Sequence, residues 1–523
     1  MTDSAPDWKP RYNPWLIAVT VTLATFMEIL DSSIANVALP HIAGGLGAGQ
    51  DESTWVLTSY LVSNAIVLPA SAWLAMIMGR KRFYMTCVAL FTASSILCGF
   101  APSLPLLILF RVLQGAGGGG MGPSEQAILA DTFPPEKRGM AFAMYGMAVV
   151  VAPAIGPTLG GWITDNFDWR WIFFINVPIG ILSLILTNRV VEDPPHLRGK
   201  GTNFRMDYVG LGLLIVGIGF LQVVLDKGQQ DDWFGSTFIT TFFLLAMAIL
   251  VALAIWEWRH PEPILELQLM RNRNFTASVI FNFVLGAVLY GTTVLIPQFL
   301  QLMMGYSAEK SGMALSPGGF VMMLMMPVAG ILVTKLDPRW IISGGFAITA
   351  AALFNMTNLS LQIDFVTAVK WRMFQVAGLS FIFIPISILS YVGIPMTKNN
   401  QISAISNFAR NLGGSVGISL LTTFLARQSQ IHQSNLVSQV ARYGHPMRNL
   451  IAGITGSMAL HGSGPALARQ QAHASLMMII QGQAMTLAFV NAFWVVAVIV
   501  TCLIPLPFLL KKPRKGAQLP LGH

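Results

Sequence analysis

Long apolar stretches, separated by short polar connections, follow one another along almost the whole chain of 523 residues. A helix that crosses the hydrocarbon core of a bilayer needs about 20 mainly apolar residues, and the stretches have about that length. They lie at residues 15–39, 54–78, 83–101, 104–126, 140–164, 170–188, 207–225, 236–257, 275–303, 311–334, 340–360, 373–395, 401–425 and 484–510. The pattern predicts an all-α integral membrane protein with fourteen spans.

The composition agrees with this prediction. Hydrophobic residues make up 54% of the chain and charged residues only 11%, about half the charged fraction of a soluble protein. The net charge of +9 comes from basic residues that lie between the apolar stretches, so we expect membrane lipids around the chain and no nucleic-acid partner. The N-terminal residues lack the basic region and cleavage site of a secretory signal, so we expect the first span to stay as an anchor.

The positions of Lys and Arg predict the orientation. If the N-terminus is cytoplasmic, 21 of the 32 basic residues fall in inside connections, nine fall outside, and Arg111 and Arg410 lie within spans. Because inside connections of membrane proteins carry the excess of Lys and Arg, we expect a multi-pass protein of the inner (plasma) membrane with both termini in the cytoplasm.

Two polar segments divide the spans into groups. A charged, proline-containing segment follows the sixth span, and a second, with Pro261 and Pro263, follows the eighth. If the spans between them are an insertion, two groups of six remain, as in transporters built from internal repeats. The predicted parts are an N-terminal six-span bundle (1–190), a cytoplasmic linker (191–206), an inserted helix pair (207–258), an interfacial segment (259–274), a C-terminal six-span bundle (275–510) and a cytoplasmic tail (511–523).

One connection, residues 427–483, is far longer than the others and is expected on the periplasmic side. Long ordered loops usually have a function. Its histidines, at intervals of 13, 16 and 12 residues, match no usual ligand spacing, so we predict no metal site. These histidines are His432, His445, His461 and His473.

Two carboxylates, Glu28 and Asp31, lie inside the first span, three residues apart and so on one helical face. A carboxylate in mid-bilayer costs about 2.5 to 3.5 kcal/mol on insertion scales, so such a residue faces a water-filled path or a partner charge. Arg111 of the fourth span lies at the same depth as Asp31, about 10 to 12 Å from the outer end. The two can therefore meet.

A movement that separates such a pair changes the affinity of the acid for a proton. This is what a proton-coupled cycle needs, so Asp31, Glu28 and Arg111 are the candidate coupling residues. The alternative is a permanent pair that only fixes helix packing.

A substrate cavity is predicted between the halves. Glu125, toward the inner end of the fourth span, is either a third acid that meets substrate or a solvated residue at a helix end. Tyr290 and nearby methionines either line a pliable apolar cavity or simply pack. The candidate cavity residues are Glu28, Glu125, Gln114 and Tyr290.

Glycine clusters mark the fourth and fifth spans, where they permit close helix approach. A phosphate-binding loop is the competing interpretation of GAGGGG, residues 115–120, but no Lys-Ser/Thr follows it. Nothing else suggests nucleotide hydrolysis, and no Ser/His/Asp or metal constellation lies at membrane depth. We therefore expect a transporter rather than an enzyme.

Four motifs follow one another in order. LDSSIANVALP covers 30–40, Arg111 and Gln114 lie in the fourth span, GPTLGG covers 156–161 and WRWIFFINVPIG covers 169–180. Together they resemble the signature motifs of the fourteen-span drug:proton antiporters of the major facilitator superfamily, in particular its EmrB/QacA branch.

The resemblance implies a major facilitator fold, with two six-helix bundles that alternate in access and two extra central helices. It implies that substrate leaves as protons enter, with Asp31 linked to coupling and Arg111 assisting proton transfer. It also implies an antiporter motif that controls bundle packing. The residues of that motif here are Pro153, Gly156, Pro157, Gly160 and Gly161.

The loop after the second span departs from the family pattern. Gly79 and Arg80 are kept as gating residues, whereas Ala72 and Met76 stand where a glycine and an acid are expected. The chain therefore lacks the acid to which the gating latch is attributed.

The predicted function is proton-driven multidrug efflux of lipophilic and toxic compounds across the inner membrane, with no cofactor beyond the proton gradient. The resemblance further implies a periplasmic adaptor (a membrane fusion protein) and an outer-membrane channel in a tripartite pump. A dedicated exporter of a physiological metabolite, siderophore or fatty acid is the alternative. A non-transporting membrane sensor is disfavoured, because no signalling domain is attached.

The charge asymmetry gives a testable topology. Single cysteines introduced within 194–204 should be shielded from an impermeant thiol reagent in intact cells, and cysteines within 435–465 should be labelled. Permeabilised cells, in which both sets should react, provide the control. The reverse pattern of labelling would contradict the orientation.

Overall fold

The computed structural model describes residues 10–134, 136–193, 207–261, 263–442, 444–460 and 464–510. Within these ranges the regular elements are all helices. Eleven helices are long and apolar enough to cross a membrane, or twelve if the bent pair Arg138–Pro153 and Ile155–Asn166 counts as one span. The all-α membrane fold is confirmed, and the number fourteen stays a prediction. The tail 511–523 and most of the linker, 194–206, lie outside the described residues.

The first half of the molecule, α1 to α9, contains the first six expected spans. The fourth expected span is broken at Gly119 and Gly120 into two helices, and the sixth begins with a short separate turn. The helices are α1 (Pro14–Leu46), α2 (Gln50–Ser53), α3 (Trp55–Met78), α4 (Arg80–Gly99), α5 (Leu104–Gly118), α6 (Met121–Thr132), α7 (Arg138–Asn166), α8 (Trp171–Phe174) and α9 (Asn176–Val190).

Two helices, α10 (Tyr208–Lys227) and α11 (Thr237–Arg259), follow as a packed pair, joined by the 3-10 turn η2 (Trp233–Gly235). Helix α10 contacts α3 of the first half and α17 of the second. The expected interfacial segment, 259–274, contains the 3-10 helix η3 (Leu267–Arg271).

The second half, α12 to α19, contains the last six expected spans. The expected spans 340–360 and 401–425 correspond to α15 and the first part of α17, which are not among the eleven apolar helices. In α17 the reason is a buried polar face that includes Asn400, Asn407 and Arg410. The helices are α12 (Arg273–Leu302), α13 (Ala308–Met313), α14 (Ser316–Lys335), α15 (Pro338–Met356), α16 (Phe365–Leu389), α17 (Asn399–Arg442), α18 (Gly444–Leu460) and α19 (Pro465–Leu503), with the 3-10 turns η4 (Met396–Lys398) and η5 (Leu506–Leu509).

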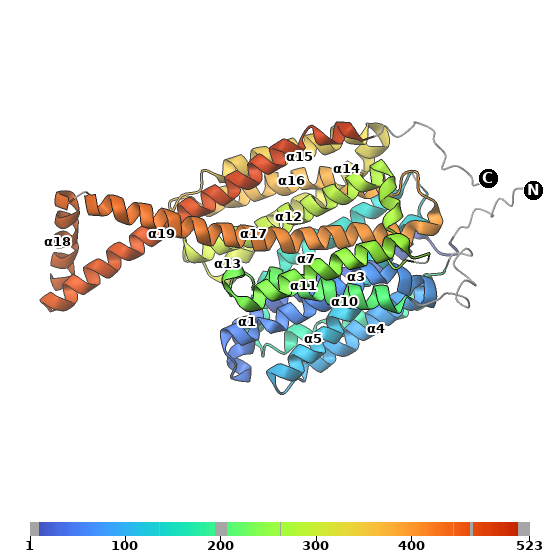
Figure 1. Cartoon of the computed structure of the whole chain (residues 1–523), viewed down its shortest axis with the longest axis horizontal. Helices are drawn as coiled ribbons and strands as arrows, with labels where there is room; N and C mark the ends of the chain where they lie inside the picture. Colours follow the sequence, from blue (N-terminus) through green and yellow to red (C-terminus); the bar gives the residue numbers. More distant parts are fainter. Residues whose placement is uncertain are drawn as a thin grey trace, which may run out of the picture.

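A helical hairpin replaces the loop expected at 427–483. Helices α17 and α19 run on beyond the bundle, and α18 lies across their far ends (Figure 1). Asn491 of α19 donates a hydrogen bond to Gln428 Oε1 (3.2 Å) and lies 2.8 Å from Nε2 of His432, both on α17. The helix continues because no proline interrupts it between Asn399 and Arg442.

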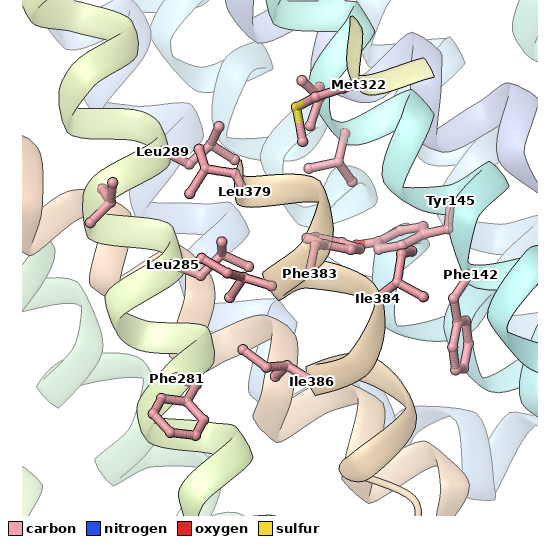
Figure 2. Packing of buried hydrophobic residues seen from close by; sticks show 14 of the residues in the cluster. Phe142, Tyr145, Phe281, Leu285, Leu289, Met322, Leu379, Phe383, Ile384 and Ile386 are labelled. Atoms are coloured by element: carbon pink, nitrogen blue, oxygen red, sulfur yellow. The ribbon is translucent and has the colours of Figure 1, made fainter. Parts of the chain in front are cut away.

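The two halves meet along α7 of the first half and α14 and α16 of the second. Aromatic rings fill much of this interface: Tyr145 and Phe383 lie 6.2 Å apart between ring centroids, and Phe142 lies 5.5 Å from Tyr391. Figure 2 shows Phe142 and Tyr145 of α7 facing Phe383 and Ile384 of α16. This packing brings the polar side chains of both halves close together.

Close approaches between the halves occur at both ends of α7. A Cβ added to Gly139 would lie 2.8 Å from the carbonyl oxygen of Gly330 on α14. At the other end, a Cβ added to Gly312 of α13 would lie 2.8 Å from Cβ of Pro157. The structure therefore has the two halves in contact toward both sides of the membrane.

The antiporter-motif glycines Gly156 and Gly160 face α1. A Cβ on Gly156 would lie 2.5 Å from Cβ of Ser33, and a Cβ on Gly160 would lie 3.1 Å from Cγ2 of Ile34. Glycine therefore lets α1 and α7 approach more closely than larger residues would.

Replacing Gly156 or Gly160 with Leu should reduce transport about tenfold or more while expression is retained. An added side chain at a tight contact costs about 1 to 3 kcal/mol, enough to shift an equilibrium between conformations by about that factor. Gly212→Leu is the matched control, since a Cβ at Gly212 on α10 meets nothing within 4 Å. Normal transport by both α7 variants would exclude this face as a working interface.

Candidate functional site

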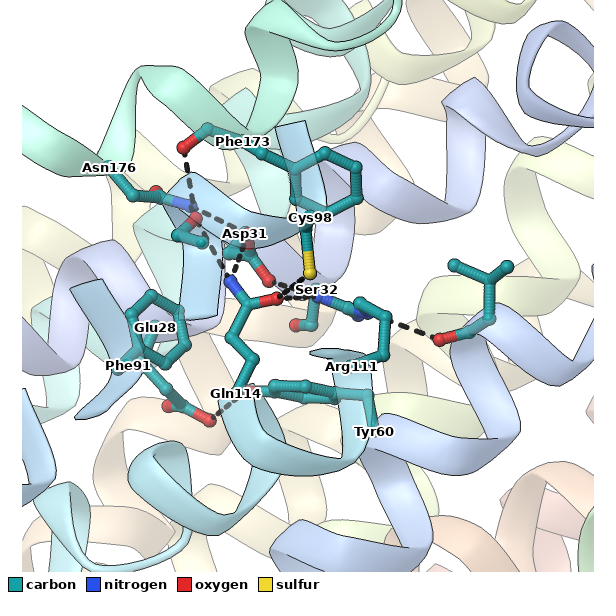
Figure 3. Close-up of polar contacts among 12 residues, drawn as sticks. Glu28, Asp31, Ser32, Tyr60, Phe91, Cys98, Arg111, Gln114, Phe173 and Asn176 are labelled. Atoms are coloured by element: carbon teal, nitrogen blue, oxygen red, sulfur yellow. Dashed lines mark hydrogen bonds and ion pairs between the residues drawn. The ribbon is translucent and has the colours of Figure 1, made fainter. Parts of the chain in front are cut away.

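A buried ion pair joins α1 and α5 (Figure 3). Nη1 of Arg111 donates to Oδ2 of Asp31 at 2.7 Å, and the two side chains are 0% and 1% exposed. The other oxygen, Oδ1, accepts hydrogen bonds from Gln114 Nε2 (3.0 Å) and Asn176 Nδ2 (2.6 Å). The carboxylate is thus charge-paired and receives two further donors in a site closed to solvent.

Arg111 is held by neutral groups as well. Its Nε donates to the carbonyl oxygen of Val56 (3.1 Å), and its Nη1 also donates to Gln114 Oε1 (2.7 Å). The guanidinium lies 4.2 Å from the ring centroid of Tyr60, a cation–π contact. These contacts and the ion pair hold Arg111 of α5 against α1 and α3, so the ion pair has a defined geometry.

Glu28 lies one turn from Asp31 in a different environment. It is partly exposed, whereas Asp31 is buried. Its Oε1 accepts hydrogen bonds from the Tyr60 hydroxyl (2.7 Å) and from Asn64 Nδ2 (3.0 Å). Asn64 Oδ1 accepts in turn from Asn411 Nδ2 of α17 (3.2 Å). A short chain of hydrogen bonds therefore connects Glu28 to the second half.

Glu125 of α6 is fully buried, which excludes the interpretation as a solvated helix end. Its Oε1 accepts a hydrogen bond from the hydroxyl of Thr22 on α1 (2.6 Å). Its Oε2 is buried without a hydrogen-bond partner among the described residues. In the same part of the chain no Lys or Arg lies within ion-pair distance of it.

A second polar network joins the halves beside Glu125. Asn407 Nδ2 donates to Gln126 Oε1 (2.7 Å), and the Tyr145 hydroxyl donates to Asn407 Oδ1 (2.7 Å). Arg410 Nη2 donates to the Tyr145 hydroxyl (2.6 Å) and to Asn407. Hydrogen bonds without a carboxylate therefore contribute to the contact between the halves.

The gating residues lie at the break between α3 and α4. Gly79 has φ of 81°, a conformation that favours glycine, and the chain turns directly into Arg80, which is buried. Arg80 forms an ion pair with Asp131 at the end of α6, and Asn399 of α17 donates to the other Asp131 oxygen at 2.6 Å. Arg80, which follows the loop without the expected acid, is thus paired with an acid of α6.

A small cavity lies between the halves, with a volume of about 20 Å³, close to the space one water molecule needs. Pro153 of the antiporter motif and Tyr290 of α12 both line it, together with Arg372 of α16. Gln114, expected in a substrate cavity, lies instead in the Asp31 cluster, and Glu28 and Glu125 do not line this cavity. The binding space between the halves is nearly closed.

Sequence reasoning missed the amide side chains Asn176, Asn64 and Asn407. Each donates or accepts next to a charged residue, and Asn176 makes the shortest hydrogen bond to Asp31. The sequence did contain a sign of this, because Asn176 is an amide among apolar residues of the stretch 170–188. A polar group at membrane depth needs a hydrogen-bond partner. A carboxylate of another span, such as Asp31, could have been predicted as the partner of Asn176.

Comparison with known protein families identifies the family of this chain. The profile of the Major Facilitator Superfamily matches residues 21–418, which includes both Asp31 and Arg111. The chain belongs to the major facilitator superfamily. As expected of a superfamily of secondary transporters, it is a multi-pass membrane transporter and not an enzyme.

Two curated relatives resemble the chain over most of its length. The multidrug export protein EmrB of Haemophilus influenzae is 39% identical over 446 residues, which cover 85% of this chain and 87% of that protein. The fatty acid resistance protein FarB of Neisseria gonorrhoeae is 37% identical over 451 residues, which cover 85% and 88%. The expected resemblance to EmrB-like transporters is confirmed.

A solved structure supports the fold. The proton:xylose symporter XylE, also of the major facilitator superfamily, superposes with a TM-score of 0.58 at 14% identity, covering 94% of this chain and 96% of that one. At this identity the match concerns the fold alone. It supports the major facilitator fold that the motifs predicted.

Proposed function

We propose that this transporter is a proton-driven multidrug exporter that works by alternating access of its two halves. The proposal draws on membership of the major facilitator superfamily and on the likeness to the multidrug export protein EmrB. A dedicated exporter of a fatty acid, siderophore or other metabolite is the second candidate, and the likeness to the fatty acid resistance protein FarB favours the fatty acid among these.

The observation that carries the proposal is the sealed pair of Asp31 and Arg111, 2.7 Å apart. With Arg111 beside it the carboxylate is favoured in its ionised form, and without the arginine the apolar surroundings favour the protonated form. A helix movement that separates α1 from α5 would therefore load a proton, and the reverse movement would release it. No cofactor is needed for this cycle.

Glu28 takes a different part in the proposed cycle. It is partly exposed and is connected through Asn64 to Asn411 on the moving second half. An acid in this position is available to a ligand between the halves as soon as they separate. We assign substrate contact to Glu28 and proton coupling to Asp31.

The proposed membrane is the inner membrane, with both termini cytoplasmic and the hairpin of α17, α18 and α19 in the periplasm. The moving units are residues 1–190 and 275–510, with 207–258 as an inserted pair. A hairpin that extends beyond the bundle offers two long helices to a periplasmic adaptor (Figure 1). An outer-membrane channel would complete a tripartite pump.

Substitutions of the two acids of α1 should have different effects on transport. Asp31→Asn imitates the protonated acid, so gradient-driven transport in proteoliposomes should be lost for every substrate, by about tenfold or more, while ligand binding survives. Glu28→Gln should reduce the uptake of cationic ligands most and leave the uptake of neutral ligands within about twofold of wild type. The measurement is ligand uptake under an imposed pH gradient, with proton release on ligand addition to the purified protein.

Wild-type protein without a gradient is the control for uptake. If Asp31→Asn releases protons as the wild type does and Glu28→Gln does not, the two roles are exchanged. If the wild type itself transports nothing from a panel of cationic, neutral and weakly acidic compounds under the gradient, the proposed function is wrong.

Deleting residues 435–470, which removes α18 and the far ends of α17 and α19, should abolish resistance in Gram-negative cells. The transport of purified protein in liposomes should stay within about twofold of wild type, because the membrane-embedded bundle is untouched. Resistance and liposome transport measured on the same variant decide between two roles. Loss of both activities would make the hairpin a structural cap rather than an adaptor-binding element.

A further inference from the structure

The second half repeats the arginine of the first half. Arg111 on α5 donates to Gln114 three residues later at 2.7 Å, and Arg372 on α16 donates to Gln375 three residues later at 2.8 Å. Helices α5 and α16 each begin the fourth span of their half, and each arginine reaches toward the first helix of its own half, α1 or α12. The two clusters are equivalent positions of an internal repeat.

The two clusters differ in the acceptor. Arg111 and Gln114 both donate to Asp31, whereas Arg372 and Gln375 both donate to Thr292. Nη1 of Arg372 donates to Thr292 Oγ1 (2.9 Å), and Nη2 donates to Thr293 Oγ1 (2.6 Å). Across the described ranges, Asp31 is within ion-pair distance of Arg111, but no carboxylate is within that distance of Arg372.

Within that part of the chain, Arg372 is therefore a buried cation with neutral partners. The residue is 4% exposed, and its three acceptors are two threonine hydroxyls and an amide oxygen. Both hydroxyls already donate to backbone carbonyls, Thr292 to Val288 and Thr293 to Leu289, so only their lone pairs face the guanidinium. Burying a charge without a counter-charge is unfavourable, and an anion beside Arg372 would offset that penalty.

Arg372 lines the cavity between the halves, whose volume of about 20 Å³ would have to widen before such an anion could enter. Among the described residues that line it, Arg372 is the charged one, and apolar side chains from α7, α12, α14 and α16 form most of the remaining wall. Val149 and Pro153 contribute the wall of the first half, and Leu289 and Val376 contribute that of the second. The wall of this cavity is therefore mainly apolar, with one guanidinium in it.

We propose that Arg372 is an anion-binding residue of the transport cavity and that it takes the carboxylate of a lipophilic weak acid. The planar guanidinium presents paired donors to a carboxylate, while the apolar tail lies against Val149 and Leu289. The inference rests on the proposed exporter function and names a substrate class for it. Cationic ligands are repelled by Arg372 and depend on Glu28 of the first half.

Equilibrium binding of radiolabelled dodecanoate to the full chain in nanodiscs of zwitterionic lipid tests the assignment, at about pH 8, where a carboxylic acid is ionised. Arg372→Gln should weaken dodecanoate binding about tenfold to a hundredfold, the usual worth of a charge-assisted hydrogen bond. Binding of dodecanol, which has the same tail and no charge, should change by less than about twofold. Equal dodecanoate affinity in wild type and Arg372→Gln would overturn the proposal.

A second pair of variants keeps Arg372 and changes its partner. Thr292→Asp supplies the carboxylate that Asp31 supplies in the first half, so the internal ion pair should weaken dodecanoate binding as much as Arg372→Gln does. Thr292→Asn is the matched neutral control and should bind within about threefold of wild type. If Thr292→Asp binds dodecanoate as tightly as Thr292→Asn, Arg372 is not the anion site.

Two further arms test whether Arg372 binds a lipid headgroup or has a purely structural role. Phosphatidylglycerol added to the nanodiscs should leave dodecanoate affinity unchanged, whereas competition would assign Arg372 to a lipid headgroup and overturn the substrate role. Uptake of a lipophilic cation under a pH gradient should persist in Arg372→Gln. Loss of cation uptake along with dodecanoate binding would make Arg372 a general structural element, and absence of uptake in wild type would refute the exporter function while the binding result stands.

Discussion

The structure depends on one constraint, which is that a charge held at membrane depth must be neutralised or hydrogen-bonded within the protein. Moving a carboxylate or guanidinium out of water costs several kcal/mol per ion, and the attraction between two such charges at about 4 Å is of the order of 4 kcal/mol at the effective dielectric near a protein surface. The pair of Asp31 and Arg111 is therefore not self-sufficient. Gln114, Asn176 and the carbonyl of Val56 supply further hydrogen bonds, and they bring α1, α3, α5 and α9 to one point.

The contact between the halves is of another kind. Asn407 with Gln126, Tyr145 with Arg410, and Asn64 with Asn411 are hydrogen bonds in which at most one partner is charged. A neutral hydrogen bond contributes about 0.5 to 1.5 kcal/mol net, because water replaces it when it breaks. Such contacts suit a surface that opens to water in each transport cycle. The Asp31–Arg111 pair, in contrast, is buried within one half, so only a movement of helices inside that half would separate it.

Much of the fold followed from the sequence, because spans are recognisable by length and composition, and the depth of Asp31 and Arg111 followed from helix rise alone. The sequence did not identify Asn176 as a partner of Asp31 or Asp131 as a partner of Arg80, because these contacts join segments whose relative rotation is set by packing. The hairpin was expected as a loop since its polar composition resembles that of a solvated connection. A helix can be polar on all sides when water and a neighbouring helix provide hydrogen-bond partners for its side chains. Here α19 is that neighbour, since its Asn491 donates to Gln428 of α17.

Helix α7 connects these features mechanically. It is bent by about 40° where Pro153 and the following residue interrupt it, as expected where a proline removes a backbone donor. Its first part contacts Gly330 of α14 and its second part contacts Gly312 of α13, while Gly156 and Gly160 beyond the bend press against α1 next to Asp31. Because backbone contacts of this kind are either made or broken, opening one end of α7 need not disturb the other. Helix α7 therefore lines the cavity of about 20 Å³ at Pro153 and packs, through Gly156 and Gly160, against the segment of α1 next to Asp31, so a movement of its second part would act on both.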